Sequence, residues 1–108
     1  MERFAWKARL LPGKLEEYIK RHDAIWPEMS AVLTQAGICN YTIWTDKETL
    51  FGYYECLSLA EAANIQAQSP VVARWNEYMK DVMVMDFDPE TGTSVQLRQI
   101  FLHPQQNP

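Results

Sequence analysis

The sequence predicts a single α+β domain whose elements follow the order β-α-β-β-α-β. Three observations lead to this fold class. The chain has 108 residues, a length that ordinarily builds one hydrophobic core rather than two. Four segments carry the apolar and aromatic pattern of strands, and the segments between them repeat apolar residues every three or four positions, as helices do. Proline, glycine and serine stand where these segments are expected to begin or end.

The first half of the chain predicts a strand followed by two helical stretches. Residues 3–10 form the strand, because their side chains fall alternately on two faces. Pro12-Gly13 ends this strand, and a helical stripe then runs through residues 14–26. Pro27 offers no N–H and disfavours helical geometry before it, so a new helix is expected to begin there. Gly37 is expected to stop that helix.

The remaining strands are predicted from β-branched and aromatic residues. Segments 38–45 and 49–57 are separated by the polar turn 46–48 and are expected to form a hairpin. Segment 86–94 contains proline and glycine and is predicted to be a loop. Residues 95–102 are expected to close the sheet as its fourth strand.

Two serines predict the second helical region. Ser58 and Glu61 have the spacing of a capping box, which opens a helix that continues to about residue 68. Ser69 precedes Pro70 as an N-cap precedes a proline in the first turn, which opens a helix to about residue 82. The whole order is that of the ferredoxin-like fold, an antiparallel sheet with helices on one face.

One face of such a sheet stays uncovered by helices. Strands 3–10 and 38–45 carry apolar residues on both faces, so we expect a second copy to cover the open face in a homodimer. The domain is expected to span residues 1–104. The polar, proline-containing residues 105–108 are expected to fray as a tail.

Composition argues against several classes of protein. The net charge of −4 disfavours nucleic-acid binding, which needs a basic surface. No apolar run is long enough to span a membrane, and the first residues do not resemble a signal peptide, so we expect a cytoplasmic protein without a membrane partner. Cys39 and Cys56 are interpreted as small buried thiols. No metal is expected, because His22 and His103 are far apart, and no cofactor motif is present.

His22 is the first candidate catalytic residue, and Tyr18 stands four positions before it. That spacing places both side chains on one face of a helix. Imidazole exchanges protons near neutral pH, and the tyrosine hydroxyl can position a sugar or orient the ring. The alternative is a histidine that only packs against a tyrosine. Tryptophan faces suit sugar C–H surfaces, although Trp6 and Trp26 follow the stripes expected of core residues.

Several motifs together are similar to one known family. Tyr18-Ile19-Lys20-Arg21-His22, followed by Ile25-Trp26-Pro27-Glu28, resembles the Y-x-x-R-H-x-x-I-W-P-E signature of the L-rhamnose mutarotase family. Asn40-Tyr41, Arg74-Trp75 and the run 78–83 agree with further blocks of that family in the same order. The similarity extends from about residue 2 to residue 104.

The resemblance implies a dimeric α/β barrel that interconverts the α and β pyranose anomers of L-rhamnose or a related 6-deoxy sugar without a cofactor. It places His22 at the proton donor and Tyr18, Tyr41 and Trp75 at sugar-binding positions. The family pattern has two consecutive tryptophans where this chain has Trp75 followed by Asn76, so Asn76 is included among the substrate-binding positions.

Mutarotation needs a proton delivered to the ring oxygen and another removed from the anomeric hydroxyl. We expect His22 to be the acid, while the base is open among Tyr18, Tyr41 and a bound water. Two other functions are compatible with this fold. One is a haem-binding or monooxygenase-type protein with His22 as axial ligand, and the other is a non-catalytic sugar-binding module.

Overall fold

A computed structural model describes residues 1–86 and 95–106. Its sheet has four antiparallel strands in the order β2-β3-β1-β4. The strands are β1 (Glu2–Leu10), β2 (Cys39–Asp46), β3 (Thr49–Cys56) and β4 (Met83–Met85). The predicted hairpin is confirmed, because β2 pairs with β3 along most of its length.

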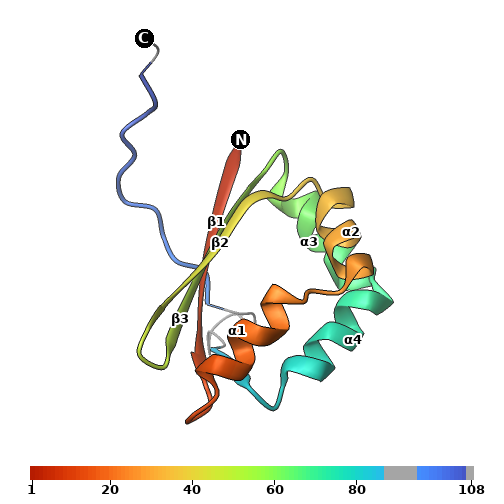
Figure 1. Ribbon diagram of the computed structural model, residues 1–108. Coiled ribbons are helices and arrows are strands. Elements are labelled where there is room, and N and C mark those ends of the chain that lie inside the picture. The colour runs from red at the N-terminus through yellow and green to blue at the C-terminus, as the bar shows by residue number, and fades with distance from the viewer. Residues whose placement is uncertain (87–94, 107–108) are drawn as a thin grey trace.

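Four helices lie on one side of this sheet (Figure 1). They are α1 (Leu15–Asp23), α2 (Pro27–Gln35), α3 (Leu59–Gln68) and α4 (Pro70–Met79). The α+β, ferredoxin-like fold class is therefore confirmed, with each crossover built from a pair of helices. None of the helices in the described ranges has the length and apolar character that crossing a membrane requires.

Helices α2, α3 and α4 begin at the predicted residues, whereas α1 ends at Asp23 rather than near residue 26 and α4 ends at Met79 rather than near residue 82. Trp26 is extended, with ψ 134°, because the following Pro27 disfavours a helical conformation there. The Ser58 hydroxyl accepts from a backbone N–H in the first turn of α3 at 3.2 Å, and Ser69 caps α4 in the same way at 3.3 Å. Gly37 has φ 76° just after α2, which is the left-handed geometry that glycine adopts without strain.

The predicted fourth strand at 95–102 is wrong. Gln96 forms one isolated bridge with Trp6, and the backbone N–H of Leu97 donates to Ala5 at 2.7 Å. The fourth strand is instead β4, which lies between the predicted helix ending near residue 82 and the predicted loop 86–94 and was assigned to neither, because three residues are too few for an alternating pattern to show. The predicted loop 86–94 lies outside the described residues, except for its first residue.

Beyond Leu97 the chain leaves the sheet and extends away from the domain (Figure 1). We call residues 98–106 the C-terminal arm. Ile100 is 83% exposed and Phe101 is 77% exposed, so these two apolar residues of the predicted strand are not packed into the domain. Strand propensity depends on a pleated surface to pack against, and the arm has none here. Of the tail expected to fray, residues 105 and 106 belong to this arm, and residues 107–108 lie outside the described range.

The core lies between the helices and one face of the sheet. It is formed mainly by even-numbered residues of β1 and β3 together with side chains from the helices, among them Trp6, Ala8, Leu10, Leu50, Tyr18, Met29, Trp75 and Met79. Trp6 lies directly across from Gly52, where any Cβ would overlap the indole. The open face of the sheet carries the odd-numbered residues of the same strands.

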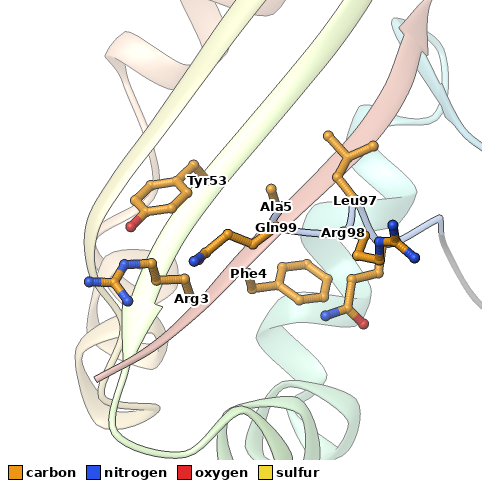
Figure 2. A pocket seen from close by; sticks show the side chains of 8 residues that line it. Arg3, Phe4, Ala5, Tyr53, Leu97, Arg98 and Gln99 are labelled. Atoms are coloured by element: carbon orange, nitrogen blue, oxygen red, sulfur yellow. The ribbon is translucent and has the colours of Figure 1, made fainter. Parts of the chain in front are cut away.

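A cavity of about 440 Å³ lies beside the N-terminal half of β1. Figure 2 shows its lining, which comes from β1, β3, the two residues before the C-terminal arm and the start of the arm itself: Arg3, Phe4, Ala5, Tyr53, Gln96, Leu97, Arg98 and Gln99. None of the predicted site residues lines it. The cavity therefore belongs to the junction of the arm with the sheet rather than to the site around His22.

Cys39 and Cys56 are both free thiols. Cys56 is fully buried, as expected, whereas Cys39 is only half-buried. Cys39 belongs to β2, the edge strand of the sheet, so it is covered by a neighbour on one side only.

Candidate functional site

Helix α1 presents Tyr18 and His22 together, as their spacing predicts. Their ring centroids are 4.2 Å apart, with the planes inclined by 31°. Tyr18 is buried in the core at 4% exposure, and His22 is half-buried above it. The tyrosine ring therefore forms a fixed support for the imidazole.

One hydrogen bond defines which nitrogen of His22 carries a proton. Nδ1 lies 3.1 Å from the main-chain carbonyl oxygen of Tyr18. A carbonyl oxygen can only accept, so Nδ1 is the protonated nitrogen of this pair. In the neutral imidazole, Nε2 then carries the free lone pair.

Burial controls the ionisation of both residues. Loss of hydration lowers the pKa of His22 below its ordinary value, although the Tyr18 carbonyl and the Asp23 charge act in the opposite direction. Burial also raises the pKa of Tyr18 well above its usual range, with a further contribution from nearby Tyr41. At neutral pH, a neutral imidazole therefore stands next to a neutral phenol.

Tyr41 reaches this side of the sheet through a β-bulge. Cys39 pairs with Glu55 and Thr42 pairs with Tyr53, so β2 contains one extra residue between these pairs. An uninterrupted register would place Tyr41 opposite Tyr53 on the open face. The bulge turns Tyr41 toward the helices instead. Within the bulge, the backbone of Asn40 adopts a positive φ of 51°.

The Tyr41 hydroxyl is held by the core. It accepts a hydrogen bond from the Trp6 indole N–H at 3.0 Å, and its ring lies 5.1 Å from that of Tyr54. Burial raises the pKa of Tyr41 to about 12. The hydroxyl keeps its own proton and can donate it to a ligand.

Trp75 of α4 joins His22 to a cluster of aromatic rings. Its indole is 7% exposed and meets the imidazole edge-on, with centroids 5.5 Å apart. Trp26 meets Trp75 edge-on at 5.1 Å, and Tyr78 lies 5.3 Å from Trp26. Trp6 is buried as expected, while Trp26 is only half-buried against the core.

Asn76 is not brought into this cluster. It follows Trp75 on α4, where successive side chains point about 100° apart, and it is exposed. In the described part of the chain, it makes none of the aromatic contacts that connect Tyr18, His22 and Trp75. The same ranges contain no group of three side chains suited to holding a metal ion.

Arg21 is a further residue of this region, and in the sequence it stands out only as the fixed arginine of the Y-x-x-R-H signature, without a predicted role. Its guanidinium contacts Glu17 on its own helix and Tyr78 and Asp81 at the end of α4. The spacing of Glu17 and Arg21 is typical of an ion pair within a helix and was available in the sequence. The contacts with the end of α4 depend on the tertiary fold, so no local sequence pattern predicts them.

An imidazole that packs against a phenol ring and an indole, on the helical side of a ferredoxin-like sheet, has the chemical groups that an acid–base site for a polyhydroxylated ligand would use. Comparison with known proteins specifies the class further. The family model for L-rhamnose mutarotase matches residues 3–103. The chain belongs to the L-rhamnose mutarotase family, a family of isomerases.

Individual relatives agree with this assignment. An L-rhamnose mutarotase of Sinorhizobium fredii is 42% identical over 103 residues, which cover 94% of this chain and 97% of the relative. One from Jannaschia is 41% identical over 106 residues, covering 96% of this chain and all of the relative.

Solved structures agree with the fold. The crystal structure of an L-rhamnose mutarotase from Formosa agariphila has a TM-score of 0.79 at 29% identity, covering 96% of this chain and all of that one. The tetracenomycin F2 cyclase of Streptomyces glaucescens shares the fold, with a TM-score of 0.61 at 14% identity over the same shares of the two chains.

Proposed function

We propose that this protein interconverts the α and β pyranose anomers of L-rhamnose, with His22 as the group that transfers protons. The observation that carries the proposal is the family match over residues 3–103, which spans His22 and its aromatic neighbours. The match favours an enzyme over the haem protein and the non-catalytic module considered from the sequence.

The state of His22 suits the first proton transfer. Its lowered pKa keeps the imidazole neutral at neutral pH, and its Nδ1–H is engaged with Tyr18, so Nε2 is free to accept. Nε2 takes the proton of the anomeric hydroxyl as the C1=O1 double bond forms. The C1–O5 bond breaks, and the imidazolium delivers a proton to O5. Rotation about C1–C2 and reversal of these steps give the other anomer.

The two tyrosines serve this reaction as neutral hydrogen-bond donors. Raised pKa values keep Tyr18 and Tyr41 protonated near neutral pH, which argues against either one as the base. The Tyr41 hydroxyl accepts from Trp6, so its own proton is available to a sugar oxygen. Both hydroxyls are proposed to hold the sugar by donating hydrogen bonds, without transferring a proton to it.

Trp75 is proposed to contact the apolar side of the sugar with the part of its indole that remains exposed. Asn76 is proposed to border the bound sugar from the exposed surface of α4 and to influence which 6-deoxy sugar is accepted. Neither role requires a metal or a cofactor, since mutarotation transfers only protons.

We propose that the active form is a homodimer. The C-terminal arm supports this proposal, because Ile100 and Phe101 are left uncovered by their own chain. The open face of the sheet and the outer edge of β2 provide surfaces that a second copy can cover.

We also propose a cytoplasmic location for the protein. The free thiols of Cys39 and Cys56 fit a reducing compartment.

Anomer exchange measured by saturation-transfer NMR tests the proposed activity. L-Rhamnose, L-fucose and L-mannose are compared at equal concentrations with catalytic amounts of the protein. We expect exchange of L-rhamnose to be accelerated the most. Saturable binding of both anomers without faster exchange would identify a sugar-binding module instead, and a haem absorption band on adding haemin would favour the haem protein.

A further inference from the structure

Arg21 directly precedes His22 in the chain, but its side chain points to different neighbours. It is 12% exposed, although it carries a positive charge. Removing a charge from water is costly unless hydrogen-bonding partners replace the water. The identity of those partners therefore indicates what the residue does.

The guanidinium uses each of its three nitrogens. Nε donates to the Glu17 carboxylate at 3.0 Å, and Nη1 donates both to Asp81 at 2.8 Å and to the main-chain carbonyl of Tyr78 at 2.7 Å. Nη2 donates to the second Asp81 oxygen at 3.3 Å. The group also lies over the Tyr78 ring, with Cζ 4.3 Å from the centroid. Arg21 is thus anchored on α1 and fastened to the C-terminal end of α4.

These two helices carry the two sides of the site. His22 and Tyr18 belong to α1, while Trp75 belongs to α4, one turn before Tyr78. The two backbones are not closely packed along each other, so side chains determine how far apart the helices lie. Arg21 makes the polar contacts between α1 and the end of α4, beside the edge-on contact of His22 with Trp75.

We propose that Arg21 is a positioning residue that sets the orientation of His22 relative to Trp75 and the sugar by clamping α1 to the end of α4. This inference rests on the proposed role of His22 in proton transfer. A lysine cannot replace the arginine, because a single ammonium group cannot bind both Asp81 oxygens, the Tyr78 carbonyl and Glu17 in a fixed plane.

Kinetics of three variants test the clamp. Small errors in the placement of a proton-transfer group lower the rate steeply, so Arg21→Gln should reduce kcat about tenfold to a hundredfold while KM changes less than about threefold. Asp81→Asn should reduce kcat in the same direction. The double variant should stay within about twofold of Arg21→Gln alone, because both changes break the same contact. Lys20→Gln, an exposed neighbour with the same charge, is the matched control and should retain kcat.

A structural measurement separates positioning from stability. The His22 ring protons lie beside the Trp75 indole, whose ring current shifts their NMR signals. In folded Arg21→Gln and Asp81→Asn protein, these signals should move away from their wild-type positions, while Lys20→Gln leaves them unchanged. Arg21→Lys should move them as well. Losses in kcat that multiply in the double variant, or His22 signals unmoved in Asp81→Asn, would overturn the clamp.

The two proposals fail in different ways. If His22→Gln retained normal anomer exchange, the proton-transfer role would be wrong, while the NMR signals of His22 in the Arg21 and Asp81 variants would still decide whether the clamp exists. If the signals stayed in place and His22→Gln were inactive, only the clamp would be rejected.

Discussion

A single hydrogen bond between two residues of one helical turn determines the chemistry open to His22. The Tyr18 carbonyl fixes the proton on Nδ1 and leaves Nε2 for the ligand. Sequence spacing alone predicts that Tyr18 and His22 share a face, and the structure confirms it. The direction of the pKa shift depends on burial, which the tertiary fold provides.

Burial of His22 leads to a prediction about stability. The unfolded chain binds a proton on His22 below about pH 6.5, whereas the folded chain resists protonation until a lower pH. The free energy of unfolding therefore falls as pH drops through this window. Between about pH 7.5 and about pH 5, the melting temperature should fall further in the wild type than in His22→Gln. Parallel curves for the two proteins would mean that His22 is not held in its neutral form.

Substrate choice is predicted to depend on the neighbours Trp75 and Asn76. Trp75→Phe keeps a buried aromatic ring but reduces its area, so KM for each sugar should rise. Asn76→Trp adds an indole at an exposed position and should change relative rates among L-rhamnose, L-fucose and L-mannose more than the overall rate. Relative rates that stay equal to wild type in Asn76→Trp would remove Asn76 from the site.

The bulge in β2 is the element that aims Tyr41 at the site, and it depends on the left-handed conformation of Asn40. Asn40→Ala should destabilise the fold by about 1–2 kcal/mol and raise KM, because alanine disfavours this conformation. Asn40→Gly is the matched control, since it also loses the Asn40–Glu55 hydrogen bond but accepts the positive φ. Equal effects of the two variants on KM would assign the role to the side chain rather than to the bulge.

Elements marked by local chemistry could be predicted from sequence, and elements decided by neighbours could not. The caps at Ser58 and Ser69 are confirmed because the capping hydroxyl and its N–H partner lie within one turn. The segment 95–102 has strand-like composition, yet only its first residues meet β1. The bulge before Tyr41 and the contacts of Arg21 with α4 likewise depend on pairing and packing between distant segments.

At the scale of the whole molecule, the C-terminal arm leads to a prediction about assembly. The full chain should be a dimer by light scattering at micromolar concentration. Replacing Ile100 and Phe101 together by serine should shift it toward monomer, because these exposed apolar side chains are expected to be buried against the second copy. Gln105→Ser, a polar change in the same arm, is the control. A full-length protein that stays monomeric would contradict the proposed homodimer.

The central claim is that His22 transfers protons during mutarotation of L-rhamnose. The most direct measurement is the rate of anomer exchange by saturation-transfer NMR for wild type, His22→Gln and the control His103→Gln, with folding of each protein verified by circular dichroism. We predict that His22→Gln loses about two or more orders of magnitude in exchange rate, the usual contribution of a general acid–base group, while His103→Gln retains the wild-type rate. Wild-type exchange in folded His22→Gln would contradict the account.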